Sequence, residues 1–172
     1  MLAEIVKKPI RVLVIGTDHA IQRHQDKNAE RQLQRAEFDK RLRQVIEGRD
    51  IDLIAEEAGD DAEVWKRLKQ EEEAVGKFAE AFGGGKTVDA PVPTTAKKIA
   101  DERPGGLRHV DIRAPNAKTL SIEERDAAMT AKVKEILGDA DSILVVVGED
   151  HRAGMVQRLK GEGMDVECLH FP

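Results

Sequence analysis

Two segments far apart in this chain have the same pattern. Residues 10–19 read IRVLVIGTDH and residues 142–151 read SILVVVGEDH, so each apolar run ends in Gly-x-x-His. Runs rich in Val and Ile are typical of strands that are buried on both faces of a parallel sheet. Functional sites of open parallel sheets lie outside the carboxyl ends of the strands. We therefore expect His19 and His151 to meet at one edge of such a sheet.

Short apolar runs alternate with helical patterns along the whole chain, as in α/β proteins. The predicted strands are residues 10–16, 51–56, 107–112, 142–148 and 164–170. The predicted helical segments are residues 20–48, 60–82, 95–103, 121–137 and 153–161. We expect one domain over residues 1–172, with a mainly parallel sheet of four to five strands between two layers of helices.

The overall composition excludes several classes of protein. A net charge of −5 and an aromatic content of 3% disfavour general nucleic-acid binding, which needs clustered Lys and Arg and stacking rings. No apolar stretch reaches the roughly 18 residues of a membrane span. Pro9 and Arg11 interrupt the N-terminal apolar run, and we interpret residues 1–15 as leading into a strand rather than as a signal peptide.

The chain contains one cysteine, Cys168. An intramolecular disulfide is therefore excluded, and the composition fits a reducing compartment, so we expect a cytoplasmic protein. Alternation with apolar residues in the last predicted strand indicates that the Cys168 thiol is buried and inert.

Histidine and carboxylate residues at strand ends are the candidate functional groups. Besides His19 and His151, the apolar run 51–55 ends in Glu56 and Glu57. Adjacent residues of a strand point to opposite faces, so only one of these carboxylates is expected to join the histidines. We prefer Glu56, because it directly continues the run. Two imidazoles and a carboxylate can hold a divalent metal or activate a water molecule.

Other polar residues near these motifs have simpler explanations. Turn formation and helix capping account for Asp18, Glu149 and Asp150. These side chains can also orient the imidazoles by accepting a hydrogen bond from the second ring nitrogen. Asp111, at the end of the third predicted strand, is a weaker candidate. The remaining histidines have no partner pattern, and we interpret them as structural or surface residues: His24, His109 and His170.

The order and spacing of these motifs resemble those of the TraB/Tiki superfamily, which also takes in erythromycin-esterase-like and ChaN-like proteins. The matching positions are Gly16 and His19, Glu56 (less well Glu57), Arg125 with Met129, and Gly148, His151, Gly154, Met155 and Leu159. The resemblance implies an α/β fold with its site at the strand ends, and metal-dependent hydrolysis as proposed for Tiki-type proteases. Other relatives are esterases of a different mechanism, a haem-iron binder or proteins of unknown activity. This chain is a small, single-domain version without their long helical insertions.

We therefore expect a hydrolase for ester or amide bonds of a small molecule or peptide. His19, His151 and Glu56 would hold a divalent metal or, without one, position the attacking water. Arg125 would stabilise developing negative charge or bind an anionic group of the substrate.

The sequence is also compatible with two other functions. One is a non-catalytic module of the same fold that binds a metal, haem or a small anion. The other is an interaction protein that uses its charged helices, residues 20–48 and 60–82, to bind a partner or to form a homo-oligomer.

Overall fold

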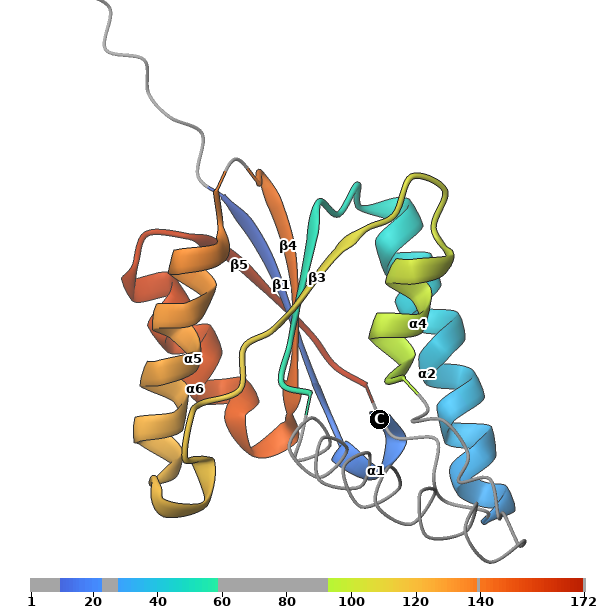
Figure 1. Ribbon diagram of the computed structural model, residues 1–172, viewed down its shortest axis with the longest axis horizontal. Coiled ribbons are helices and arrows are strands. Elements are labelled where there is room, and N and C mark those ends of the chain that lie inside the picture. Colours follow the sequence, from blue (N-terminus) through green and yellow to red (C-terminus); the bar gives the residue numbers. More distant parts are fainter. Residues whose placement is uncertain (1–9, 23–27, 59–92, 139, 172) are drawn as a thin grey trace, which may run out of the picture.

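The structure is a computed structural model that describes residues 10–22, 28–58, 93–138 and 140–171. Within these residues, five strands form one all-parallel sheet in the order β3-β2-β4-β1-β5 (Figure 1). The strands are β1 (Arg11–Thr17), β2 (Leu53–Glu56), β3 (Arg108–Asp111), β4 (Ser142–Gly148) and β5 (Asp165–Leu169). The predicted sheet is confirmed, and every strand begins and ends within two residues of its expected position.

Helices cover both faces of the sheet and complete three layers (Figure 1). They are α1 (His19–Gln22), α2 (Ala29–Gly48), α4 (Thr95–Glu102), α5 (Ile122–Ile136) and α6 (Glu149–Gly161), with a 3-10 turn, η1, at Ala117–Thr119. Helices α2 and α4 lie on one side, and α5 and α6 lie on the other. The predicted helix at 60–82 and residues 23–27 of the predicted segment 20–48 lie outside the described residues.

Helix α6 begins four residues earlier than the pattern predicts, at Glu149 rather than near position 153. Gly148 is both the last residue of β4 and the N-cap of the helix. The strand therefore leads directly into α6, and no loop separates them.

Strand residues alternate between two apolar cores, one under each helical layer. Val12 and Val14 belong to the core under α5 and α6, whereas Leu13 and Ile15 belong to the core under α2 and α4. Every residue of β4 is buried, because this strand lies at the centre of the sheet. Burial on both faces explains why the strands read as continuous apolar runs.

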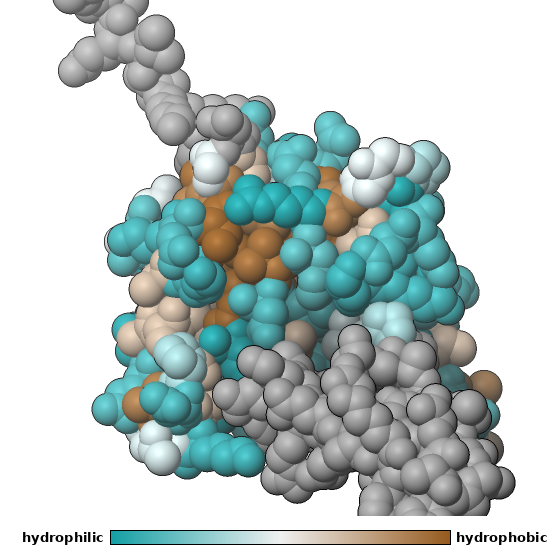
Figure 2. All heavy atoms as spheres, viewed as in Figure 1, coloured by the Kyte–Doolittle hydropathy of each residue, from teal (hydrophilic) through white to brown (hydrophobic). Residues whose placement is uncertain are grey.

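The outer surfaces of the helices and the edge of the sheet differ in polarity. Figure 2 shows hydrophilic side chains over the α2/α4 layer and a hydrophobic area between the α5/α6 layer and β3. Strand β3 forms one edge of the sheet, and only part of its surface is covered. No helix in the described ranges has the length and apolar character that a bilayer span requires.

Cys168 is exposed, so the prediction of a buried thiol is wrong. It lies on β5, the other edge strand, where an alternating pattern has no complete covering layer to pack against. Its sulfur accepts a hydrogen bond from Arg152 Nη1 at 3.3 Å.

Helix α5 begins with the expected capping box. Ser121 Oγ accepts from the Glu124 backbone N–H at 3.2 Å, and Glu124 Oε2 accepts from the Ser121 backbone N–H at 2.8 Å. These hydrogen bonds, that of the Ser121 backbone first, hold the pKa of Glu124 below its usual value.

Replacing Ser121 with alanine should lower the free energy of unfolding by about 1 kcal/mol, because the first turn loses its side-chain acceptor. Urea denaturation measures this change. The depressed pKa of Glu124 means that its contribution is present at neutral pH and is lost as the pH falls through that pKa. The stability difference between the native protein and Glu124→Gln should therefore shrink on acidification, and a difference that stays constant down to low pH would contradict the role of the carboxylate.

Candidate functional site

The carboxyl ends of β1 and β4 bring the two Gly-x-x-His motifs side by side. These strands are parallel neighbours, with Gly16 opposite Val147 and Thr17 opposite Gly148. His19 is the first residue of α1, and His151 lies in the first turn of α6, so both histidines begin helices. Each histidine is therefore placed by the first turn of a helix that follows its strand.

Both imidazoles face the carboxylate of Glu57. His19 Nε2 lies 3.7 Å from Glu57 Oε2, and His151 Nε2 lies 3.6 Å from Glu57 Oε1. The Gly148 backbone N–H donates a hydrogen bond to Oε2 at 3.0 Å and holds the carboxylate at the end of β4. One carboxylate therefore lies between the two histidines, with one oxygen toward each ring.

Glu56, the carboxylate preferred from the sequence, instead turns toward α4. Its Oε2 accepts hydrogen bonds from Thr94 Oγ1 at 2.6 Å and His109 Nε2 at 2.7 Å. The side chain is fully buried, and its Oε1 has no hydrogen-bond partner among the described residues. Glu56 lies two residues after Ile54 and points to the same face of the sheet, toward α2 and α4. The expected contact between Glu56 and the two histidines is therefore not formed, and Glu57 makes it instead.

His109 therefore has a partner that the sequence did not indicate. It lies on β3, the neighbour of β2, and its side chain is 9% exposed. Among the described residues, the Glu56–His109 pair makes no hydrogen bond or ion pair with His19 or His151, because Glu56 and Glu57 point to opposite faces of the sheet.

The Nδ1 atoms determine how the two rings of the candidate site are oriented. His19 Nδ1 lies 3.0 Å from Gln22 Oε1, and His151 Nδ1 lies 2.6 Å from Asp126 Oδ1. Both oxygens are acceptors, so a neutral ring at either position would donate its N–H from Nδ1 and would keep a lone pair on Nε2. Two such lone pairs then face the oxygens of Glu57, an arrangement that becomes favourable when a positive charge or a hydrogen-bond donor lies between them.

Asp126 is a site residue that sequence reasoning missed. It lies on α5 on the same buried stripe as Met129 and Val133, and it is 3% exposed. A carboxylate on an apolar helical stripe is rarely buried without a partner, and this was the available signal. Its partner, His151, belongs to another helix and could not be identified from spacing.

Arg125, the expected anion-binding residue, lies beside Asp126 and is partly buried. Its Nε is buried and finds no hydrogen-bond partner in the described ranges. No contact joins its guanidinium to the histidines or to Glu57 within the described part of the chain. Its predicted role toward substrate therefore stays a prediction.

The glycine of each motif makes room for a side chain of the other motif. A Cβ atom added to Gly148 would lie 2.6 Å from His19 Nε2, and one added to Gly16 would lie 2.3 Å from Glu149 Oε2 and 2.7 Å from Arg152 Cδ. Real Cβ atoms do not approach other atoms so closely. The repeated glycine is thus explained by the close pairing of β1 with β4.

The acidic residues Asp18 and Glu149 form ion pairs instead of the expected side-chain caps, and α6 begins without a side-chain cap among the described residues. Asp18 pairs with Arg31 at 2.7 Å, and Glu149 pairs with Arg152 at 2.6 Å. Asp111 Oδ1 accepts backbone hydrogen bonds, among them one from Ala58 at 3.2 Å. These side chains stabilise the ends of the strands and helices around the site.

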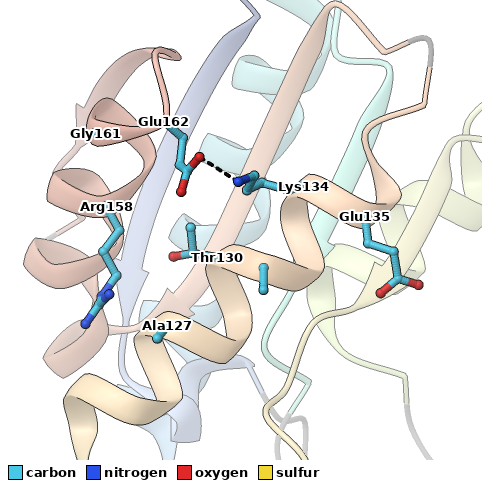
Figure 3. Close-up of a pocket in the computed structure, with 8 residues that line it drawn as sticks. Ala127, Thr130, Lys134, Glu135, Arg158, Gly161 and Glu162 are labelled. Atoms are coloured by element: carbon cyan, nitrogen blue, oxygen red, sulfur yellow. Dashed lines mark hydrogen bonds and ion pairs between the residues drawn. The ribbon is translucent and has the colours of Figure 1, made fainter.

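A large groove elsewhere on the surface has no relation to these residues. It has a volume of about 790 Å³ and lies between α5 and α6 (Figure 3). Its lining residues are Ala127, Thr130, Ala131, Lys134, Glu135, Arg158, Gly161 and Glu162. An ion pair between Lys134 and Glu162, at 2.6 Å, joins the two helices there.

No protein family, curated protein or solved structure matches this chain. Membership of the TraB/Tiki superfamily therefore stays a prediction that the motifs carry.

Proposed function

We propose that the carboxyl edge is the catalytic centre of a small hydrolase for ester or amide bonds, in which His19, Glu57 and His151 hold a divalent cation. The observation that carries this proposal is that both Nε2 atoms face one carboxylate while each Nδ1 is held by another acceptor. Two imidazoles and a carboxylate are a common metal-ligand set. Metal-binding histidines usually donate their second N–H to a neighbouring oxygen, which fixes the ring.

Each separation between an imidazole nitrogen and a Glu57 oxygen is close to the spacing of two ligands on one cation. Two ligands bonded at about 2.0–2.2 Å to a tetrahedral ion lie roughly 3.3–3.6 Å apart, and the two observed separations are 3.6 and 3.7 Å. In the described ranges, however, no group of three or more His, Cys, Asp or Glu side chains already has the arrangement of a metal site. Binding therefore requires a side-chain movement, and His19, with its side chain 39% exposed, has the space for it.

Burial differs across the site and supports a catalytic rather than a purely structural role. Side chains of Glu57 and His151 are 6% and 3% exposed, whereas that of His19 is 39% exposed. A substrate would therefore approach from the His19 side, against a buried carboxylate and a fixed imidazole. A cation bound there would supply Lewis-acid activation of a carbonyl group and of the attacking water.

A metal-free mechanism is the second candidate, and the short contact between His151 and Asp126 favours it. The Asp126–His151 pair leaves Nε2 as the basic nitrogen of the ring. His151 would then remove a proton from water as a general base, with Asp126 stabilising the imidazolium that forms.

Metal content tests the first candidate directly. Untagged protein is incubated with a panel of divalent cations, desalted and analysed by elemental mass spectrometry. We expect close to one equivalent of metal in the native protein and none in a folded His19→Ala/His151→Ala variant, because two of three ligands are removed. His170→Ala is the matched control, since His170 is exposed and lies outside the site, and it should retain the metal.

Each protein is then assayed on chromogenic ester and amide substrates. Metal that persists in the double variant would contradict a site at these histidines. Hydrolysis that depends on His151 but needs no metal would select the general-base mechanism. Stoichiometric metal binding without hydrolysis of any of these substrates would contradict the proposed hydrolase activity and would favour a non-catalytic binding module.

A further inference from the structure

Asp126 and Gly154 lie against each other on the side of His151 that faces away from Glu57. Asp126 Oδ1 is 2.6 Å from His151 Nδ1, and the two side chains are 5% and 3% exposed. A Cβ atom added to Gly154 would lie 1.8 Å from Asp126 Oδ2 and 2.9 Å from its Cγ. The carboxylate therefore occupies the space that any larger residue at position 154 would take.

We propose that Asp126 is a positioning residue of the site and that Gly154 is required for it. Asp126 keeps the proton of His151 on Nδ1, and the lone pair on Nε2 then points toward Glu57. The catalytic importance of this positioning rests on the proposed function. The contacts of Asp126 with His151 and Gly154 do not depend on any ligand.

Two carboxylates compete for the ring of His151, and distance decides between them. A neutral imidazole has one N–H, which can be donated to Asp126 or to Glu57. The separation on the Asp126 side, 2.6 Å, is that of a short hydrogen bond, whereas 3.6 Å on the Glu57 side is beyond one. Both carboxylates are buried, so water does not compete for the hydrogen bond between His151 Nδ1 and Asp126.

The need for glycine at position 154 comes from Asp126 alone. The three nearest atoms that an added Cβ would meet are Oδ2, Cγ and Cβ of Asp126. Gly154 and Asp126 also line a groove of about 420 Å³ between α5 and α6. In the middle of a helix glycine is normally unfavourable, so its presence here calls for a specific reason such as this contact.

The tautomer of His151 can be measured without metal or substrate, by long-range ¹H–¹⁵N correlation spectra of the imidazole rings in the metal-free protein. We expect the native His151 to be protonated on Nδ1 and unprotonated on Nε2. Gly154→Ala should displace the carboxylate and lose this state. Asp126→Asn keeps the size of the side chain but can turn its amide N–H toward Nδ1, and it should shift the ring proton to Nε2.

Two controls separate this effect from general damage to the helix. Gly161→Ala changes the same helix at a position where an added Cβ has no atom within 4 Å, and it should leave the His151 signals unchanged. In an Asp126→Ala background the obstacle is gone, so Gly154→Ala should have no further effect on them. If Gly154→Ala alone does not fold, Asp126→Asn still decides the matter.

A native His151 that carries its proton on Nε2 would overturn the inference, as would unchanged His151 signals in both Asp126→Asn and Gly154→Ala. When the proposed metal site is also correct, Asp126→Asn should lower cation affinity by roughly 10- to 100-fold. If the tautomer behaves as expected but no variant binds metal or hydrolyses a substrate, the positioning role stands and the proposed function fails.

Discussion

Replacing Gly148 with alanine should strongly impair the function of the site while leaving the fold intact. The added Cβ would lie 2.6 Å from His19 Nε2 and 3.1 Å from its Cε1, so the ring must leave its place beside Glu57. We expect the hydrolytic rate to fall about 100-fold, as misplacement of a catalytic group by an ångström commonly causes. The free energy of unfolding should change by less than about 1 kcal/mol, because the backbone at φ −58° suits alanine and His19 can turn outward.

Controls for this prediction come from the chain itself. Gly48→Ala introduces the same change where no atom lies within 4 Å of the new Cβ, and it should leave activity unchanged. Once His19 is replaced by alanine, Gly148→Ala should cause no additional loss, since the clash has been removed. Additive losses in the double variant would show that Gly148 acts by some route other than His19.

The neighbouring carboxylates Glu56 and Glu57 should respond in opposite ways to the same substitution. Glu57→Gln removes the charge between the two imidazoles, and we expect it to lower cation affinity at least about 100-fold with the fold retained. Glu56→Gln should leave cation affinity within a few-fold of native. It should instead reduce the free energy of unfolding by about 1–2 kcal/mol, because the charge-assisted hydrogen bonds from Thr94 and His109 are weakened in a buried place.

Isothermal titration with a divalent cation and urea denaturation of the same two variants provide both measurements. The pair is its own control, because the two residues are adjacent, chemically identical and both buried. Equal loss of cation affinity in Glu56→Gln and Glu57→Gln would contradict the assignment of Glu57 to the site. Full affinity in Glu57→Gln would do so as well, because the cation would then bind without this carboxylate.

The strands could be predicted well because their signal is local. Runs of branched apolar residues are needed wherever a strand is covered on both faces, and β1 and β4 meet this condition over most of their length. The pattern is weaker at the edge of the sheet, and there it misplaced Cys168. Helix α5 was also predictable, because its capping box involves residues only three positions apart.

The choice between Glu56 and Glu57 shows where local patterns stop being sufficient. The alternation of a strand predicts that the two side chains point to opposite faces of the sheet. It does not predict which face carries the two histidines. Helix α6 places His151 and helix α5 places Asp126 on one side of β2, whereas Thr94 at the start of α4 lies on the other. Contacts between such distant segments depend on how the layers pack.

By itself, the sequence determined that this chain forms a parallel α/β sheet and that two histidines follow two of its strands, since both features depend on neighbours along the chain. Only the tertiary structure decided that β4 lies between β1 and β2, so that His19, His151 and Glu57 share one place. It also decided which glycines must stay small and which acid orients His151. The physical reason is that strand order and helix packing depend on the apolar surface that all strands and helices bury together. Each short motif accounts for only a small part of that surface, so it does not specify the arrangement.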